Sequence, residues 1–105
     1  MKMMKQGTTP VVDFKTTYTA KDMSSLYFVF TQSGQRVLEK GLTDAVWGDS
    51  YVAVNLTKAE TYLFKPGLAH VQMGGDLVNG MSARTVSYYF TVDKADKQPN
   101  EGGES

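Results

Sequence analysis

Hydrophobic and polar positions alternate most clearly in two segments separated by Asn79-Gly80. A two-residue turn at this dipeptide would place Val78 opposite Met81 and pair the segments residue by residue. Apolar residues then face one another, and so do polar ones: Met73 with Val86, Val71 with Tyr88, Ala69 with Phe90, His70 with Tyr89 and Gln72 with Ser87. Asn-Gly favours the tight turn of a hairpin, and a one-residue shift would exchange the two faces. The sequence therefore predicts an antiparallel hairpin over residues 68–92.

The same alternation predicts strands upstream of this hairpin. Three segments each carry one apolar face: Val12 and Phe14 in residues 11–15, Leu26, Phe28 and Phe30 in residues 26–31, and Val52, Val54 and Leu56 in residues 51–56. Pro10 suits the beginning of an edge strand because proline has no amide to donate. Each of these strands is therefore expected to bury one face and expose the other.

Two connections carry recognisable turn chemistry. Ser33-Gly34-Gln35 closes a hairpin into residues 36–40, where a three-residue loop would set Phe30 opposite Leu38 and a two-residue loop would favour Val37; the sequence leaves both open. The segment from Thr57 to Glu60 matches a capping box, in which the first and fourth residues bond each other's amides. It predicts a short helical turn over residues 57–64.

These elements predict an all-β protein, an antiparallel immunoglobulin-like β-sandwich of about seven strands with one short helical turn (57–64) before the last hairpin. A closed small barrel is the alternative that periodicity does not exclude. Residues 1–8 are expected to form an N-terminal arm, because the segment from Gly7 to Pro10 breaks regular structure. Residues 9–92 would form the sandwich, and residues 93–105 a polar flexible tail.

Composition narrows the classes of partner. The 105 residues suit one domain, and eleven basic residues balance eleven acidic ones. With no net positive charge and no Lys/Arg cluster, nucleic acid and anionic membranes are not expected as partners. The sequence contains no cysteine, so it forms no disulfide or thiolate metal site. Its start lacks the apolar core of a secretion signal, so we expect the protein to be made and kept inside a cell.

Few residues offer catalytic chemistry. His70 is the single histidine, and the hairpin register points it away from the core beside Tyr89. A solvent-facing strand residue is a better interpretation of His70 than a general base or a metal ligand. No calcium loop, phosphate-binding glycine loop or Gly-x-Ser-x-Gly motif occurs. We therefore expect no enzymatic activity, no cofactor and no metal.

Aromatic residues with polar tips are the candidate interface. Four of them are expected to face outward: Tyr27, Trp47, Tyr51 and Tyr89. Such side chains are enriched at protein interfaces, although they also pack across strands in proteins that bind nothing. Met1, Met3 and Met4 lie in the predicted arm, which could add to a sheet edge of a neighbour.

Several short motifs resemble those of small phage-encoded immunoglobulin-like proteins. They are Gln6-Gly7-Thr8-Thr9-Pro10 followed by Val-Val-x-Phe, Leu56-Thr57-Lys-Ala-Glu60-Thr61, Phe64, Pro66-Gly67, Ala-His-Val-Gln72 and Phe90-Thr91-Val92. Over residues 6–92 the chain is similar to the N-terminal domain of phage baseplate upper proteins. The resemblance implies a β-sandwich and a virion component without catalytic residues.

The expected function is therefore a non-enzymatic structural component of a bacteriophage virion (head, neck or baseplate), assembled in the host cytoplasm. Its partners would be phage structural proteins or copies of itself, in a homo-oligomer or a larger assembly. The alternative is a small adhesive or carbohydrate-binding β-sandwich for host-surface attachment, with Trp47 and Tyr51 as an aromatic platform. A small regulator that binds a host enzyme is a third hypothesis.

Overall fold

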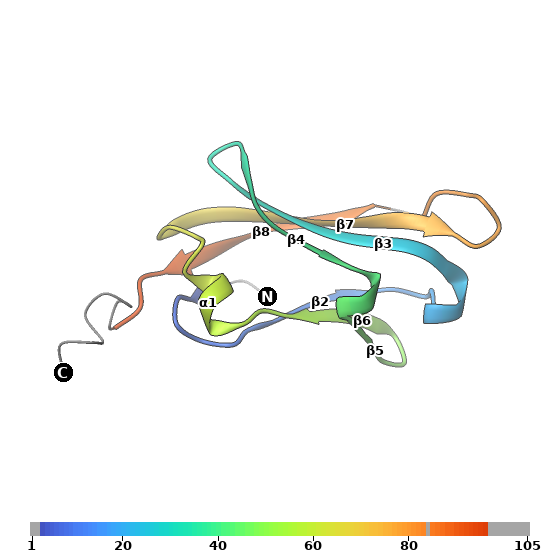
Figure 1. Ribbon diagram of the computed structural model, residues 1–105, viewed down its shortest axis with the longest axis horizontal. Helices are drawn as coiled ribbons and strands as arrows, with labels where there is room; N and C mark the ends of the chain where they lie inside the picture. Colours follow the sequence, from blue (N-terminus) through green and yellow to red (C-terminus); the bar gives the residue numbers. More distant parts are fainter. Residues whose placement is uncertain (1–2, 84, 97–105) are drawn as a thin grey trace.

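Two β-sheets face each other across one apolar layer in the computed structural model, which describes residues 3–83 and 85–96 (Figure 1). The strands are β1 (Met3–Lys5), β2 (Val11–Lys15), β3 (Met23–Gln32), β4 (Gln35–Gly41), β5 (Ala45–Trp47), β6 (Tyr51–Asn55), β7 (Gly67–Leu77) and β8 (Val86–Asp93). Two 3-10 turns, η1 (Ala20–Asp22) and η2 (Leu42–Asp44), and one helical turn, α1 (Lys58–Thr61), join strands. The predicted all-β sandwich is confirmed.

The order of the strands is that of an immunoglobulin-like domain. One sheet has the order β1-β8-β7-β3-β4 and the other the order β2-β6-β5. If the strands are lettered as in immunoglobulin domains, β2, β6 and β5 take the positions of B, E and D, and β8, β7, β3 and β4 those of G, F, C and C′. Two separate sheets of this order identify a sandwich and not a closed barrel.

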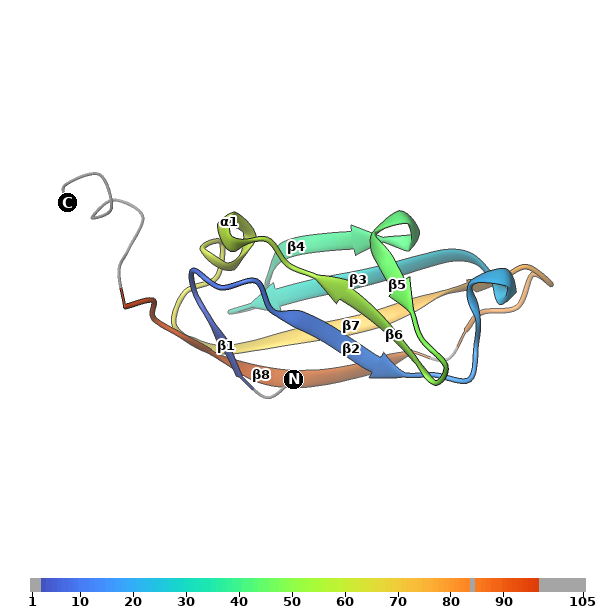
Figure 2. The same cartoon turned by 90° about the horizontal axis from the view of Figure 1, so that it is seen from below.

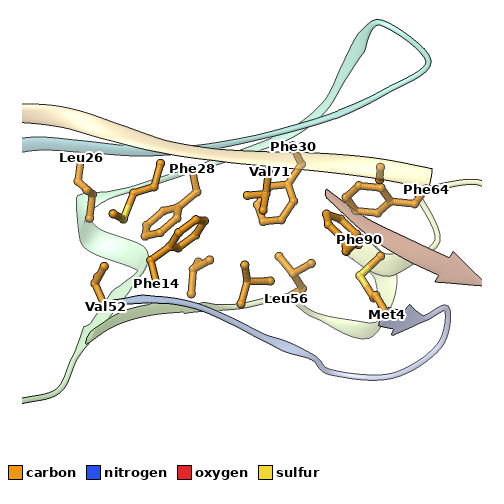
Figure 3. Close-up of a cluster of buried hydrophobic side chains, with 14 of the residues drawn as sticks. Met4, Phe14, Leu26, Phe28, Phe30, Val52, Leu56, Phe64, Val71 and Phe90 are labelled. Carbon is orange, nitrogen blue, oxygen red and sulfur yellow. The ribbon is translucent and has the colours of Figure 1, made fainter. Parts of the chain in front are cut away.

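Aromatic and aliphatic side chains together fill the space between the sheets (Figure 3). Phe14 of the smaller sheet packs against Phe28 of the larger, with ring centroids 5.9 Å apart. At the other end Phe30, Phe64 and Phe90 form a cluster of edge-to-face pairs 5.9–6.3 Å apart. Such pairs add about 1 kcal/mol each to the burial of their surface. The predicted core faces of β2, β3 and β6 are thus confirmed.

The β7–β8 hairpin has the predicted register over most of its length. Met73 pairs with Val86, Val71 with Tyr88 and His70 with Tyr89. The turn differs, because the Leu77 amide donates to the carbonyl of Met81 at 2.7 Å and Asp76 bridges to Ser82. Only Gly80 of the Asn-Gly dipeptide has a positive φ, so the predicted two-residue turn, which needs two, does not form. The Val78 amide bonds instead to the carbonyl of Asp22.

Both connections with turn chemistry form. Ser33 and Gly34 have positive φ and make a two-residue turn, but a bulge after Phe30 still brings Phe30 opposite Leu38. The loop thus has two residues, as in one of the predicted alternatives, whereas the pairing of Phe30 with Leu38 is the one predicted for a three-residue loop. The capping box is confirmed: the Glu60 amide donates to Thr57 Oγ1 at 3.1 Å, and the Thr57 amide donates to Glu60 Oε1 at 2.8 Å.

An ion pair ties α1 to the edge of the larger sheet. Lys40 Nζ of β4 lies 2.6 Å from Glu60 Oε2, and both side chains are partly buried. Burial raises the pKa of Glu60, but hydrogen bonds from Lys40 and Thr57 outweigh it, so the pKa of Glu60 is lowered overall. The helical turn that crosses between the sheets is therefore fixed by charge as well as by its cap.

The N-terminal segment is part of the sandwich. Met3–Lys5 form β1, which pairs in parallel with Thr91–Asp93 of β8. Met4 is 1% exposed in the core, and the buried Gln6 side chain donates to the carbonyl of Phe64 at 2.7 Å. The boundary expected between an arm and the sandwich at residue 8 is thus not where the folded unit begins. Met1 lies outside the described residues.

The C-terminal boundary also lies further along than expected. β8 continues to Asp93, and Ala95 is buried, with its amide 3.2 Å from the acceptor Gln6 Oε1. Asp96 pairs with Lys5 at 2.9 Å. Residues 93–96 therefore pack beside the N-terminal segment, and residues 97–105 of the predicted tail lie outside the described residues.

The docking of β1 generates a paired prediction. Met4→Ala removes a core side chain and is expected to lower the free energy of unfolding by about 2–5 kcal/mol. Met3→Ala, on the neighbouring and 60% exposed position, should change it by less than about 0.5 kcal/mol. Urea denaturation followed by circular dichroism measures both. Equal, small effects would contradict the docking of β1.

Candidate interaction surface

The outer face of the five-stranded sheet carries most of the candidate interface. Strand alternation turns every second residue away from the core. We call this surface the outer face; its main residues are Met3, Tyr27, Val29, Thr31, Leu68, His70, Gln72, Ser87, Tyr89 and Thr91. The register aligns them in rows across the sheet, so residues far apart in the sequence lie side by side.

Leu68 and Tyr89, two exposed side chains with large apolar surfaces, line a hollow on this face. Tyr89, Leu68 and Met3 are 60–66% exposed, and the ring of Tyr89 lies 4.8 Å from that of His70. A hollow of about 280 Å³ is lined by Leu68, His70, Tyr89 and the β3–β4 turn. The tip of this hairpin rises away from the smaller sheet and forms one wall (Figure 1). The outer face is therefore not flat.

Charged side chains lie at the margins of the outer face. Arg36 pairs with Glu39 at 3.0 Å on the edge strand β4, and Lys5, the last residue of β1, pairs with Asp96. The central rows, from Val29 through Gln72 to Ser87 and from Thr31 through His70 to Tyr89, contain no Asp, Glu, Lys or Arg. The centre of the outer face thus mixes polar and apolar side chains without charge, and depletion of charged residues at the centre is typical of protein interfaces.

The four predicted aromatic residues are not brought together. Tyr27 and Tyr89 lie on the outer face, whereas Trp47 and Tyr51 belong to the smaller sheet. The outward position expected for Trp47 is wrong. Trp47 packs against the core, because its partner in the β5–β6 pair is the buried Val52.

The two remaining tyrosines differ in what they cover. Tyr51 is 44% exposed, and its ring lies over Gly48, where a Cβ would come within 2.0 Å of the ring. Tyr27 lies over Gly74 in the same manner. Both glycines therefore provide the space that a tyrosine ring occupies.

Two residues of the outer face were missed in the sequence. Leu68 has the same parity as His70 in the predicted hairpin, so its outward position was available from the alternation alone. Met3 had no such signal, because its place depends on the pairing of β1 with the distant β8.

A second feature lies where β2 and β8 run along the same open side of the sandwich (Figure 2). A groove of about 990 Å³ separates the end of β2 and the β5–β6 turn from the start of β8. Its lining includes Lys15, Tyr18, Asp49, Met73, Val86 and Ser87. This groove and the hollow on the outer face are separate sites.

Tyr88 closes the open side between β2 and β8. Its ring packs 5.1 Å from that of Phe14, and its hydroxyl is buried without a hydrogen-bond partner among the described residues. Burial, together with the negative charge of Asp13, raises the pKa of Tyr88 to about 12. A buried hydroxyl without a partner lowers stability relative to an apolar side chain of the same shape.

No site for metal chemistry emerges from the described residues. Among residues 3–83 and 85–96, no three His, Asp or Glu side chains gather to hold an ion. The His70 ring packs against the Tyr89 ring at the surface in a tilted arrangement, beside the partner that the hairpin register predicts. Within the same ranges there is no helix of the length and apolarity needed to span a bilayer.

Known proteins resemble this chain in structure but not in sequence. No family model matches the sequence, and no curated protein shows significant similarity to it. A candidate glycoside hydrolase from Bacteroides vulgatus ATCC 8482 is similar over 92% of this chain and 17% of its own, with TM-score 0.58 and 11% identity. CopC from Methylosinus trichosporium OB3b is similar over 93% and 90%, with TM-score 0.56 and 14% identity. At such identities the likeness concerns the fold alone.

A V domain of an amphioxus protein is a more distant match, with TM-score 0.33 and 14% identity over 87% of this chain and 98% of its own. The present chain spans less than a fifth of the length of the hydrolase chain.

The buried hydroxyl of Tyr88 generates the second prediction. Tyr88→Phe should raise the free energy of unfolding by about 1 kcal/mol at neutral pH, because it removes an unsatisfied polar group. Between about pH 10 and pH 12 the unfolded tyrosine loses its proton while the folded one keeps it, so the wild type loses stability there. The advantage of the phenylalanine variant should therefore grow over this range.

Chemical denaturation at pH 7, 10 and 11.5 measures the effect. Tyr51→Phe is the matched control, because that side chain is 44% exposed and should show no such growth. A loss of stability in Tyr88→Phe at pH 7 would contradict the assignment of an unsatisfied hydroxyl.

Proposed function

We propose that this protein is a non-enzymatic assembly module that binds other proteins through the outer face of its five-stranded sheet. The observation that carries the proposal is the pair of exposed side chains Tyr89 and Leu68 beside a hollow whose lining contains no Asp, Glu, Lys or Arg. Hot spots of interfaces are enriched in tyrosine and lie in pockets from which water is excluded. A partner side chain that enters the hollow would bury both the Tyr89 ring and Leu68.

The setting we propose for this assembly is a bacteriophage virion, in the head, neck or baseplate, with assembly in the host cytoplasm. Partners are copies of the chain or other phage structural proteins. The resemblance of residues 6–92 to phage immunoglobulin-like proteins supports this setting, and the β-sandwich is the fold that the resemblance implies. A rigid sandwich also suits assembly, since its face changes little on binding.

The same hollow supports one alternative, a small adhesive module that binds carbohydrate. A sugar ring could stack on Tyr89 while its hydroxyls bond to His70 and Thr31. The platform of Trp47 and Tyr51 suggested by the sequence is not available, because Trp47 packs inward. A glycan array probed with the wild type and with Tyr89→Ala decides this alternative, which requires a signal that the variant loses.

The interface proposal gives the third prediction. Tyr89→Ala should weaken self-association, or binding to purified phage structural proteins, at least tenfold, because it truncates the aromatic anchor beside the hollow. Tyr51→Ala is the matched control, an exposed tyrosine on the other sheet, and should leave binding unchanged. Analytical ultracentrifugation and surface plasmon resonance measure the two kinds of association.

Circular dichroism spectra of Tyr89→Ala and Tyr51→Ala are the control that tests whether both variants are folded. A protein that stays monomeric at all concentrations and binds no phage structural protein would overturn the proposal, and so would equal losses in the two variants.

A further inference from the structure

The open side of the sandwich is bordered by two free strand edges. On β8, the carbonyl of Asp93 accepts the amide of Gln6 at 3.0 Å and therefore points toward β1 and away from β7. Main-chain groups alternate in direction along a strand, so the amides and carbonyls of Thr91, Tyr89 and Ser87 point the same way. β1 covers this edge at Thr91–Asp93, but no described strand pairs with the outward groups of Ser87.

The facing edge belongs to β2. The Leu56 amide donates to the carbonyl of Pro10, and the Thr16 amide donates to the carbonyl of Ser50, each at 3.0 Å. The even-numbered residues of β2 are thus bonded to β6, and the main-chain groups of Val11, Asp13 and Lys15 point outward. No described strand pairs with that edge.

The groove of about 990 Å³ lies between these edges. Lys15 lines it from the β2 side and Ser87 from the β8 side, while Tyr18, Met73 and Val86 supply apolar surface. A separate cavity of about 10 Å³ shares Thr16, Tyr18 and Met73 with the groove, and Trp47 and Leu26 also line that cavity. Lys15 and Asp49 have no ion-pair partner among the described residues.

β1 shows that the outer edge of β8 accepts an extended strand. It lies on β8 as a parallel strand, with Met4 inserted between the sheets and Met3 on the outer face. The free part of the β8 edge continues from this position to the groove. An extended segment placed there would repeat the arrangement, with one side chain entering the groove and its neighbours facing outward.

We propose that the groove binds an extended peptide segment of a partner protein, which adds as a strand to the edge of β8 at Ser87. Its inward residue is apolar and contacts Met73 and Tyr18, and an acidic residue pairs with Lys15. Main-chain hydrogen bonds supply affinity in such strand addition, and the side-chain pocket supplies selectivity. This site shares Ser87 with the outer face but no residue with the hollow beside Tyr89, so either proposal can fail without the other.

A random heptapeptide library, displayed on mRNA and selected against the full chain, provides the probe. Enriched peptides should bind with chemical-shift changes at Ser87 and Tyr18 in NMR spectra. Ser87→Pro should then weaken binding at least tenfold, because it removes the outward amide and leaves the bonds to β7 intact. Ser87→Ala is the matched control: it keeps the amide and should bind like the wild type.

A charge exchange tests the site without touching the backbone. Lys15→Glu changes an exposed side chain and should weaken the selected peptide about fivefold, and replacing the acidic residue of the peptide by lysine should restore binding to this variant. Thermal unfolding shows whether each variant is folded. If Ser87→Pro does not fold, the charge exchange decides alone.

Any of these results would overturn the inference: no enrichment of any peptide, equal binding by Ser87→Pro and the wild type, or shift changes confined to Tyr89 and His70 on the outer face. Binding of oligosaccharides but not of peptides would also overturn it.

Discussion

Aromatic packing between the two sheets is the interaction on which the rest of the structure depends. The chain has no cysteine, so the disulfide that joins the sheets of antibody domains has no counterpart here. Apolar contacts hold the two sheets together instead. The main ones are Phe14 against Phe28 at one end and the cluster of Phe30, Phe64 and Phe90 at the other. These contacts fix which faces of β2, β3 and β8 are buried, because a shift by one residue would turn their phenylalanines into solvent.

The same constraint determines what the surface displays. Since Ala69, Val71 and Phe90 must face inward, Leu68, His70 and Tyr89 must face outward. The proposed outer face is therefore a consequence of core packing combined with the choice of residues at the alternate positions. Natural strands with a solvated face usually carry polar residues there. The exposed Leu68 and Tyr89 depart from that pattern, which makes them informative about binding.

The sequence predicted what local alternation controls. The register of β7 with β8, the core faces of β2, β3 and β6, and the cap at Thr57 all depend on residues near one another in the chain. The pairing of β1 with β8 escaped prediction because β1 is too short to show alternation and its partner lies at the other end of the sequence. Trp47 was misplaced for a related reason, since its direction is set by the pairing of a three-residue strand with β6. The groove was not predictable either, because it is formed by edges of two different sheets.

The parallel pairing of the first and last strands has a mechanical consequence. A force that pulls the two ends of the chain apart acts along β1 and β8 in opposite directions, parallel to their axes. All the hydrogen bonds between them then carry the load at once, in shear, whereas an antiparallel hairpin pulled at its open end would unzip one bond at a time. The buried Met4 adds the resistance of a side chain that must be dragged out of an apolar layer. Stretching the chain by its ends therefore requires the hydrogen bonds between β1 and β8 to break together.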